Sequence, residues 1–322
     1  SAYGKTTDQV YGTYQPQPVA TNMLYDMASL TKVMATTCVI MHMVERGLVR
    51  LSDPISQYIP QFATNQQKAQ VTLWDVLTHT SGLPGPIKLY QQYQSREQMI
   101  EGICRQELLF VPGTSQTYSD LGFMLLGEVV RIVSMQNLDA YAQHYLFEPL
   151  RMKDTLFNPP PSIWDRVIPT EYVEWRSGLV HGRVHDENAE VMGGVAGQAG
   201  LFSTIEDVAT FCTMILNFGE YAGTRILGHE SVLAMTSVQS VAPDESFGLG
   251  WVINAPYFMG SLTSNDTFGH TGFTGTSMVL NLNHSLALVL LSNRVCPTRN
   301  GLNINLYRQR IANTVAELCK EK

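Results

Sequence analysis

The sequence has few charged residues and few cysteines for its length, and it has no long apolar run. Only 15% of its 322 residues are Asp, Glu, Lys or Arg, and the formal net charge is −7. Together with 44% hydrophobic residues, this composition is typical of a chain that buries a sizeable core as one large domain or two modest ones. A negative net charge without a basic run argues against nucleic-acid binding. No stretch reaches about 18 consecutive apolar residues, so no transmembrane span is predicted.

The five cysteines are scattered and form no C-x-x-C pair, and their odd number leaves at least one free thiol. Cys38 falls within an apolar run, where we expect it to be buried and inert. The sequence contains no internal repeat or low-complexity tract. It begins with Ser rather than Met, so we expect a processed or cropped chain whose signal peptide, if any, is out of view.

The most informative stretch contains Ser29 and Lys32, which a helix would place on one face, one turn apart. Residues 33–44 are apolar nearly all round and predict a buried helix, with Asp26 as its N-cap and Gly47 as its end. Ser29 is then expected in the first turn, where backbone N–H groups lack intrahelical partners. This position suits a nucleophile whose own N–H stabilises an oxyanion, provided that a neighbour takes the serine proton. An N-capping serine is the alternative interpretation.

Two further segments carry polar residues at the ends of predicted elements. Tyr118-Ser119-Asp120 follows a turn at residues 111–114 and precedes a helical run at 121–133. His270-Thr271-Gly272 follows a strand-like segment and precedes a predicted hairpin with arms at 277–282 and 286–291.

With these three motifs in this order, the chain resembles the serine β-lactamase and penicillin-binding-protein superfamily in its class C-like branch. That branch has Ser-x-x-Lys, Tyr-x-Asn and Lys-Thr-Gly, or variants of them. The segments at 25–32, 77–83, 148–152, 200–204 and 248–251 also resemble members of the superfamily, and the resemblance covers nearly the whole chain. The segments at 184–189 and 193–197 are similar to a subgroup with penicillin-binding-protein-4B-like DD-carboxypeptidases and cell-wall esterases.

The resemblance implies an α/β (α+β) fold of the β-lactamase/transpeptidase type, with an antiparallel sheet flanked by helices and an inserted, mostly helical domain. Residues 1–51 and 242–322 would form the α/β domain, residues 52–241 the helical domain, and the active site would lie between them. An N-terminal strand would share the sheet with strands after residue 247. Relatives carry a helix and a strand ahead of the segment like Ala2-Tyr3-Gly4. We therefore expect these to be missing here, which would leave the sheet with an open edge.

Residues 300–319 predict a closing amphipathic helix. Its expected apolar face consists of Ile304, Tyr307, Ile311, Val315 and Leu318.

The resemblance implies that Ser29 accepts the acyl group and that Lys32 takes or relays its proton. A lysine with a pKa of about 10.4 is no base at neutral pH unless that pKa is lowered. Asp120 stands where relatives usually have Asn, and an ionised Asp120 would favour the ammonium form of Lys32. Tyr118 then becomes the better base, with Lys32 as the cation that holds its phenolate.

His270 stands where most relatives have Lys, and a histidine changes charge near pH 6.5. We therefore predict an inflection in the pH–rate profile between roughly 5.5 and 7.5. The backbone N–H groups of Ser29 and Phe273 are the expected oxyanion hole. Thr271 and Gly272 are expected to contact a substrate lying antiparallel to this strand, with Gly272 allowing a close approach.

Other polar residues are expected near the pocket. His185 and Asp186 are placed at its rim, and Gln198 stands where relatives often have His. His181, His185 and Asp186 have metal-like spacing, but in a glycine-rich loop we interpret them as polar loop residues, and neither a metal nor another cofactor is predicted. The glycines at 194, 197 and 200 lack the context of a phosphate loop. His79 is expected to be structural.

The leading interpretation is a serine hydrolase that works through an acyl-enzyme. D-Ala-D-Ala peptides, small carboxylic esters and β-lactams compete as substrates, with peptidoglycan fragments among the expected peptide partners. Peptides and esters rank above lactams, because the carboxylate of Asp120 cannot donate a hydrogen bond to a lactam side chain. A non-catalytic ligand-binding or sensor domain on the same fold is the rival interpretation. By analogy with relatives, the bacterial envelope or periplasm is favoured as its location, with the cytoplasm as the alternative.

Overall fold

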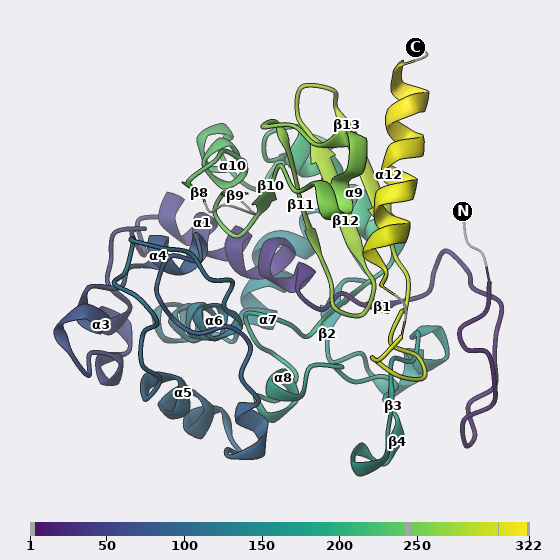
Figure 1. The fold of residues 1–322 in the computed structure, drawn as a ribbon, viewed down its shortest axis with the longest axis horizontal. Coiled ribbons are helices and arrows are strands. Elements are labelled where there is room, and N and C mark those ends of the chain that lie inside the picture. Colours follow the sequence, from purple (N-terminus) through teal and green to yellow (C-terminus); the bar gives the residue numbers. More distant parts are fainter. Residues whose placement is uncertain (1–3, 242–245, 302, 321–322) are drawn as a thin grey trace.

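The structure is a computed structural model that describes residues 4–241, 246–301 and 303–320. Antiparallel strands lie to one side and most of the helices to the other (Figure 1). The strands are β1 (Tyr25–Asp26), β2 (Leu156–Phe157), β3 (Tyr172–Val173), β4 (Gly178–Leu179), β5 (Leu201–Ser203), β6 (Glu220–Tyr221), β7 (Thr224–Arg225), β8 (Ser240–Val241), β9 (Ser246–Phe247), β10 (Val252–Ile253), β11 (Thr267–Thr271), β12 (Ser277–Asn281) and β13 (Leu286–Leu290).

The α-helices are α1 (Cys38–Glu45), α2 (Ile55–Tyr58), α3 (Gln66–Gln70), α4 (Leu73–Leu77), α5 (Arg96–Cys104), α6 (Asp120–Ser134), α7 (Leu138–Ala142), α8 (Glu187–Val191), α9 (Ile205–Leu216), α10 (His229–Thr236), α11 (Pro256–Met259) and α12 (Asn305–Lys320). Shorter 3-10 and π-helical segments are η1 (Lys32–Thr37), η2 (Pro60–Phe62), η3 (Leu89–Gln91), η4 (Gln143–Phe147), η5 (Pro161–Arg166), η6 (Glu174–Arg176) and η7 (Gly260–Leu262).

The largest sheet has the strand order β13-β12-β11-β10-β9-β8, and each neighbouring pair is antiparallel. The predicted hairpin is confirmed, because β12 and β13 form its arms. All residues of β12 are buried, as expected for an apolar strand with a neighbour on each side. In Figure 1 this sheet lies in green beside α12, and α9 packs against β12 and β13. The mixed α/β class with antiparallel strands is therefore as predicted.

The N-terminal strand does not join that sheet, contrary to the prediction. Strand β1 pairs antiparallel with β5, and β5 pairs with β2 in a separate three-stranded sheet. The partner of β1 is thus a strand from the middle of the chain. Strand periodicity reports which face is buried but does not identify the strand that completes the hydrogen bonds.

The predicted nucleophile helix is present as η1 followed by α1. All six residues of η1 and most of α1 are buried, as their continuous apolar sequence requires. Gly47 ends the helix with φ +67°, and the N–H of Leu48 bonds to the carbonyl of Met43. Asp26 is not the N-cap, because it lies in β1 and its carboxylate accepts hydrogen bonds elsewhere.

Helix α12 buries a different face from the predicted one. Leu306, Tyr307, Ile311 and Leu318 are exposed, whereas Arg308, Ala312 and Ala316 are buried. The helix packs against α11 and η7. Small alanines allow this close contact, so the larger apolar residues at helical spacing face outward.

The boundary predicted at residue 242 lies outside the described residues, and the division into two domains remains a prediction. Among the described residues, no single helix is both long and apolar enough to cross a membrane. One bent pair, Asp120–Ser134 with Leu138–Phe147, passes the same test only when its two helices are taken together.

Candidate active site

Four side chains from two distant motifs meet at the start of η1. The ammonium Nζ of Lys32 donates to Ser29 Oγ at 3.0 Å and lies 2.6 Å from Asp120 Oδ1. It also lies over the ring of Tyr118, 4.8 Å from the centroid. The Tyr118 hydroxyl interacts with both Lys32 and Ser29. The first two predicted motifs are therefore in direct contact.

Ser29 sits in a tight turn immediately before the helix. Ala28, which precedes it, has φ +48°, a conformation that is costly for a residue with a Cβ. The N–H of Ala28 donates to Asp26 Oδ1 at 2.8 Å, and the other oxygen of that carboxylate accepts from the N–H of His185 at 2.7 Å. Burial raises the pKa of Asp26, and these hydrogen bonds lower it again in part. Asp26 thus holds the strained turn and joins it to the segment around His185.

Lys32 is charged in this environment. Its side chain has no exposed surface, and burial by itself lowers its pKa. The nearby charge of Asp120 outweighs burial, aided by Tyr118, and the pKa of Lys32 rises to about 12. Because the ammonium is the stable form, Lys32 does not provide a free amine at neutral pH.

Tyr118 is enclosed between η1, α6 and the large sheet. Burial raises its pKa, while the Lys32 ammonium lowers it and Asp120 raises it. The ring of His79 packs against Tyr118 with centroids 4.6 Å apart, and His79 Nδ1 accepts from the N–H of Ser119 at 3.1 Å. His79 is buried and has φ +59°. It touches the back of Tyr118, consistent with the structural role predicted for it.

His270 and Thr271 end strand β11 beside Ser29. His270 is buried, and its Nδ1 lies 2.9 Å from the carbonyl oxygen of Thr271. Burial and the neighbouring Lys32 ammonium lower the pKa of His270 to about 3. With this pKa the imidazole stays neutral between pH 5.5 and 7.5, which argues against the predicted inflection as an effect of His270.

Gly272 is needed for the approach of two backbone segments. A Cβ at this position would lie 2.7 Å from the Met27 carbonyl oxygen and 2.1 Å from Thr276 Oγ1. Thr276 Oγ1 donates to the Met27 carbonyl at 3.1 Å, and Thr274 Oγ1 donates to the Asp26 carbonyl at 2.7 Å. The residues after β11 are thus fastened directly to the turn that carries Ser29, and the chain's own backbone, not only a substrate, requires the glycine.

The same contacts bring Phe273 close to Ser29. Among the described residues, the N–H groups of Ser29 and Phe273 have no hydrogen-bond partner. The Phe273 ring is stacked on His185 with centroids 5.6 Å apart, and the Arg294 guanidinium lies 4.4 Å from its centroid on another side. These contacts fix the position of Phe273, although nearly half of its surface is exposed.

His185, Asp186 and Gln198 form another wall of the site. The Gln198 carbonyl oxygen accepts from Lys32 Nζ at 3.3 Å, and its side-chain amide donates to Asp186 Oδ1 at 3.3 Å. Burial raises the pKa of Asp186 to about 6, with a further contribution from Asp120. Gly197 makes this arrangement possible, because a Cβ there would lie 1.9 Å from the Phe123 carbonyl oxygen on α6.

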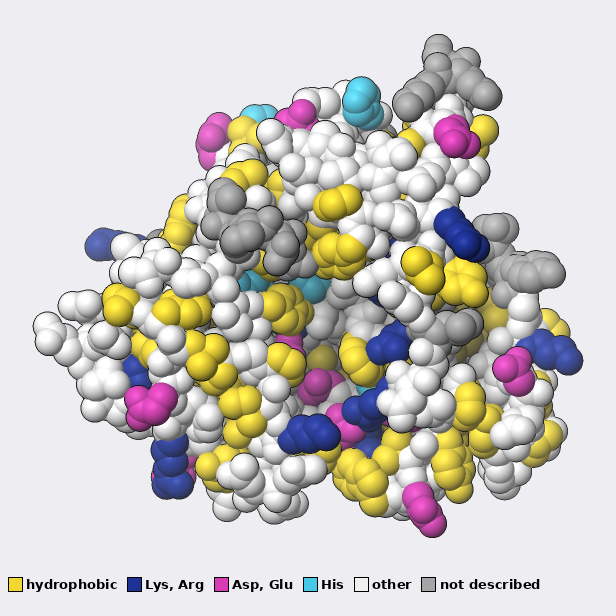
Figure 2. Space-filling view, viewed as in Figure 1, with side chains coloured by type: hydrophobic (Ala, Val, Ile, Leu, Met, Phe, Trp, Pro, Cys, Tyr) yellow, Lys and Arg dark blue, Asp and Glu magenta, His cyan; other side chains and the backbone are white. Residues whose placement is uncertain are grey.

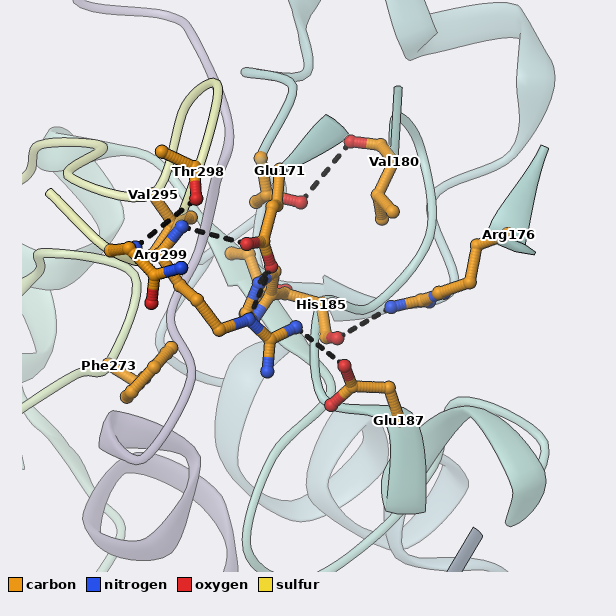
Figure 3. Close-up of polar contacts among 12 residues, drawn as sticks. Glu171, Arg176, Val180, His185, Glu187, Phe273, Val295, Thr298 and Arg299 are labelled. Atoms are coloured by element: carbon orange, nitrogen blue, oxygen red, sulfur yellow. Dashed lines mark hydrogen bonds and ion pairs between the residues drawn. The ribbon is translucent and has the colours of Figure 1, made fainter. Parts of the chain in front are cut away.

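A polar cluster behind this wall was not predicted from the sequence (Figure 3). His185 Nε2 lies 2.9 Å from Glu171 Oε2, and Arg299 donates to Glu171 through Nε at 2.6 Å and through its backbone N–H at 2.7 Å. Arg299 also reaches Glu187 Oε1 at 2.5 Å. Burial raises the pKa of Glu171, but the bonds from His185 and Arg299 lower it to about 2. Since Glu171 and Arg299 are far apart in the sequence, no local pattern could have paired them.

Two cavities share Ser29, Tyr118 and Phe273 as common walls. The larger, about 570 Å³, also reaches Arg294 and Arg308, and none of the described residues in its lining is a carboxylate. The smaller, about 390 Å³, is lined by Asp120, Asp186, Glu187, Gln198, Lys88 and Arg299, among others. Figure 2 shows a hollow near the middle of this face in which acidic side chains gather, with Lys and Arg side chains beside it. The sequence analysis did not single out Arg294 and Arg308, which line the larger cavity.

The histidines with metal-like spacing point to different partners. His181 Nε2 lies 2.8 Å from the Trp164 carbonyl oxygen, whereas His185 faces Glu171. Within the described ranges, no group of three or more His, Cys, Asp or Glu side chains could hold a metal ion.

Comparison with known proteins identifies the family. The beta-lactamase family model matches residues 3–312, and the chain therefore belongs to the beta-lactamase family. It is 36% identical over 312 residues to a protein of Escherichia coli K12 named putative D-alanyl-D-alanine carboxypeptidase, covering 87% of this chain and 71% of that one. A Salmonella typhi protein of the same name is 33% identical over 327 residues, covering 91% and 74%.

Solved structures agree on the fold. A family VIII carboxylesterase superposes with a TM-score of 0.74 at 21% identity, covering 97% of this chain and 87% of that one. The class C beta-lactamase of Rhodobacter sphaeroides superposes with a TM-score of 0.73 at 18% identity, covering 94% of this chain and 88% of that one. The octameric penicillin-binding protein homologue of Pyrococcus abyssi superposes with a TM-score of 0.72 at 22% identity, covering 93% of this chain and 67% of that one. The resemblance found in the sequence is thus confirmed at the level of family and fold.

Proposed function

We propose that this protein is a serine hydrolase that transfers an acyl group to Ser29 and then to water. The observation that carries the proposal is the contact of Ser29 Oγ with Lys32 Nζ at 3.0 Å, beside Tyr118 and two unpaired backbone N–H groups. A nucleophile, a proton acceptor and two oxyanion donors are the groups that acyl transfer requires. The substrates that we favour are D-Ala-D-Ala-type peptides or small carboxylic esters.

In the proposed mechanism the Tyr118 phenolate is the base and the Lys32 ammonium stabilises it. Ser29 Oγ bonds to the substrate carbonyl carbon while its proton passes to the Tyr118 oxygen. The carbonyl oxygen becomes an oxyanion that accepts from the N–H groups of Ser29 and Phe273. When the intermediate collapses, the bond to the leaving amine or alcohol breaks and Tyr118 returns the proton to it. In the second half of the reaction, water attacks the carbonyl carbon of the acyl-enzyme and gives its proton to Tyr118. The bond to Ser29 Oγ then breaks, and Tyr118 returns the proton to Ser29.

Proton acceptance by Tyr118 fits the electrostatics of the site better than acceptance by Lys32. The pKa of Lys32 is about 12, and the ion pair with Asp120 keeps the ammonium in place. The pKa of Tyr118 is also raised, so only a small fraction is phenolate at neutral pH. The reaction is therefore expected to accelerate as the pH rises into the alkaline range.

The peptide substrate is supported by the larger cavity and by the relatives. Arg294 and Arg308 line that cavity, and none of its described lining residues is a carboxylate, so we expect it to attract a leaving group with a free carboxylate, as a C-terminal D-Ala has. The relatives at 33–36% identity carry the carboxypeptidase name, whereas the esterase is similar only in fold. Hydrolysis of β-lactams is the lesser possibility, because Asp120 offers no donor to a lactam side chain.

The test is the intact mass of the protein after mixing with benzylpenicillin, together with release of D-Ala from Nα,Nε-diacetyl-L-Lys-D-Ala-D-Ala. We expect a covalent adduct and peptide turnover that are both absent in Ser29→Ala. Tyr118→Phe should slow acylation at least about 100-fold, the usual contribution of a general base. Acylation of Tyr118→Phe at the wild-type rate would refute the assignment of the base. Ligand binding that survives Ser29→Ala, with no adduct and no turnover in the wild type, would favour a binding domain instead.

A further inference from the structure

We propose that the smaller cavity beside Ser29 binds a primary ammonium group carried by the acyl part of the substrate. This inference rests on the proposed acyl transfer at Ser29 and adds the chemical class of substrate. Among the described residues, two acceptor groups in the cavity wall carry it: the Asp186 carboxylate, which has no cationic partner, and Gln198 Oε1, which has no donor.

The first group is the carboxylate of Asp186. Three carboxylates line the cavity, and two of them have cations: Asp120 lies 2.6 Å from Lys32 Nζ, and Glu187 lies 2.5 Å from Arg299. The donors to Asp186 within the described ranges are both neutral, the Ala189 N–H at 2.7 Å and the Gln198 amide at 3.3 Å. A partly buried carboxylate gains most from a nearby cation when its own hydrogen bonds are to uncharged groups.

The second group is the side-chain oxygen of Gln198. This side chain is 1% exposed and lines the same cavity. Its Oε1 has no hydrogen-bond partner among the described residues, while its amide nitrogen is used by Asp186. A buried amide oxygen without a donor is costly, so a ligand that donates here would be favoured.

A primary ammonium matches both acceptors. It carries a positive charge for Asp186 and three N–H donors, enough to supply Gln198 Oε1 as well. An anionic acyl group would be repelled by the same carboxylate. Asp186 makes no ion pair within the described residues: Lys32 is paired with Asp120, and Arg299 is paired with Glu171 and Glu187.

The two cavities assign the charge to one part of the substrate. The larger cavity suits an anionic leaving group, because Arg294 and Arg308 line it and no carboxylate does so in the described part of the chain. Ser29 lines both cavities, so a carbonyl held there would direct its acyl part into the smaller one. The favoured substrate therefore has an ammonium in its acyl part and an uncharged or anionic leaving group.

The test compares matched substrates with and without the positive charge. One pair is the 4-nitrophenyl ester of 6-aminohexanoate and its N-acetyl derivative. The other pair is Nα-acetyl-L-Lys-D-Ala-D-Ala and its Nε-acetyl derivative. We expect kcat/KM to favour the ammonium member by about tenfold, the value of one good hydrogen bond to a charged group.

The variant Asp186→Asn isolates the charge. Asp186 caps α8 by accepting from Ala189, and Asn is an equally good cap, so the helix start is retained. The ratio of kcat/KM between the two members should fall to within about twofold in this variant, since no ion pair remains. Glu101→Gln, which removes a carboxylate on α5 outside both cavities, is the control and should keep the wild-type ratio.

A pH series supplies a second readout. The charged groups that act on Asp186 are Asp120 on α6, Glu187 on α8 and Lys32 on η1, and its pKa is about 6. The preference for the ammonium substrate should therefore decline as the pH falls below about 6, because the carboxylate becomes protonated.

The outcomes separate the two proposals. Turnover without a preference, or a preference that survives Asp186→Asn, would overturn the ammonium site and leave the serine mechanism intact. Absence of Ser29-dependent turnover for all four compounds would refute the proposed function and this site with it.

Discussion

The ion pair between Lys32 and Asp120 makes a quantitative prediction about stability. Lys32 is completely buried and the Asp120 side chain is 18% exposed, with 2.6 Å between Nζ and Oδ1. Removing one partner of a buried pair costs about 3–5 kcal/mol. A pKa of about 12 for Lys32, against an ordinary 10.5, corresponds to about 2 kcal/mol of stabilisation of the charged form. We therefore expect Asp120→Asn to lose at least about 2 kcal/mol, and up to about 5 kcal/mol, at neutral pH.

The pH dependence of this loss has a defined sign. In the wild type the folded-state pKa of Lys32 is raised, so its contribution is complete below pH 10.5 and is lost as the pH rises through about 12. In Asp120→Asn the carboxylate is gone while burial remains, which lowers the pKa of Lys32. The folded variant then releases a proton more easily than its unfolded chain. The stability difference between variant and wild type should therefore shrink as the pH rises from 7.5 to 9.5.

The assay is urea unfolding of both proteins at these two pH values, followed by far-UV circular dichroism and tryptophan fluorescence together. Asp139→Asn is the matched control, because Asp139 also lies in the first turn of a helix, α7, but makes no ion pair within the described residues. It should lose less than about 1 kcal/mol, the usual helix-terminus contribution. Equal losses in Asp120→Asn and Asp139→Asn, or a gap that widens with pH, would refute the reasoning.

Three further predictions follow from the same structure. With an uncharged ester, the pH–rate profile between pH 5.5 and 7.5 should have the same shape in the wild type and in His270→Gln, because the pKa of His270 is about 3; an inflection lost in the variant would contradict this. Gly272→Ala should lower kcat by about 100-fold, because the added Cβ would lie 2.7 Å from the Met27 carbonyl oxygen and would push that carbonyl away. In the control Gly85→Ala the nearest atom to the added Cβ lies at 3.4 Å, so this variant should have nearly the wild-type rate. Similar rates for the two variants would contradict this expectation. Glu171→Gln should lower the free energy of unfolding by about 3 kcal/mol in urea at pH 7. The lowered pKa of about 2 means that ionised Glu171 stabilises the folded state above pH 4.5, and this stabilisation is lost as the pH falls toward 2. A loss below about 0.5 kcal/mol in the variant would show that the hydrogen bonds of Glu171 contribute little.

Local patterns predicted the elements of the fold well. The hairpin of β12 and β13 and the helix α6 follow from periodicity, and Gly47 ends its helix with the left-handed conformation that only glycine adopts easily. These features depend on neighbouring residues, so a single sequence contains the relevant information. The contact of Ser29 and Lys32 with Tyr118 and Asp120 depended instead on recognising three motifs in a known order.

Features that depend on distant partners were not predictable in this way. The pairing of β1 with β5 and the contact of Glu171 with Arg299 join segments with no shared local pattern. Burial decided two further results: it lowered the pKa of His270, and it selected Ala312 rather than Ile311 for the packed face of α12. Solvent exclusion around a side chain is a property of the assembled molecule.

The two hydrogen bonds that Thr274 and Thr276 donate to the Asp26 and Met27 carbonyls have a consequence for folding. Thr274 Oγ1 bonds to the Asp26 carbonyl across 248 residues of chain. Closing a loop of this length costs about 5 kcal/mol of chain entropy. Contacts around the two ends offset this cost only after the intervening chain has folded. Ser29, the proposed nucleophile, and the proposed oxyanion donor of Phe273 are therefore expected to meet late, so a growing or truncated chain should lack the second donor. A reagent that acylates Ser29 would therefore label fully folded molecules and leave incompletely folded ones unlabelled.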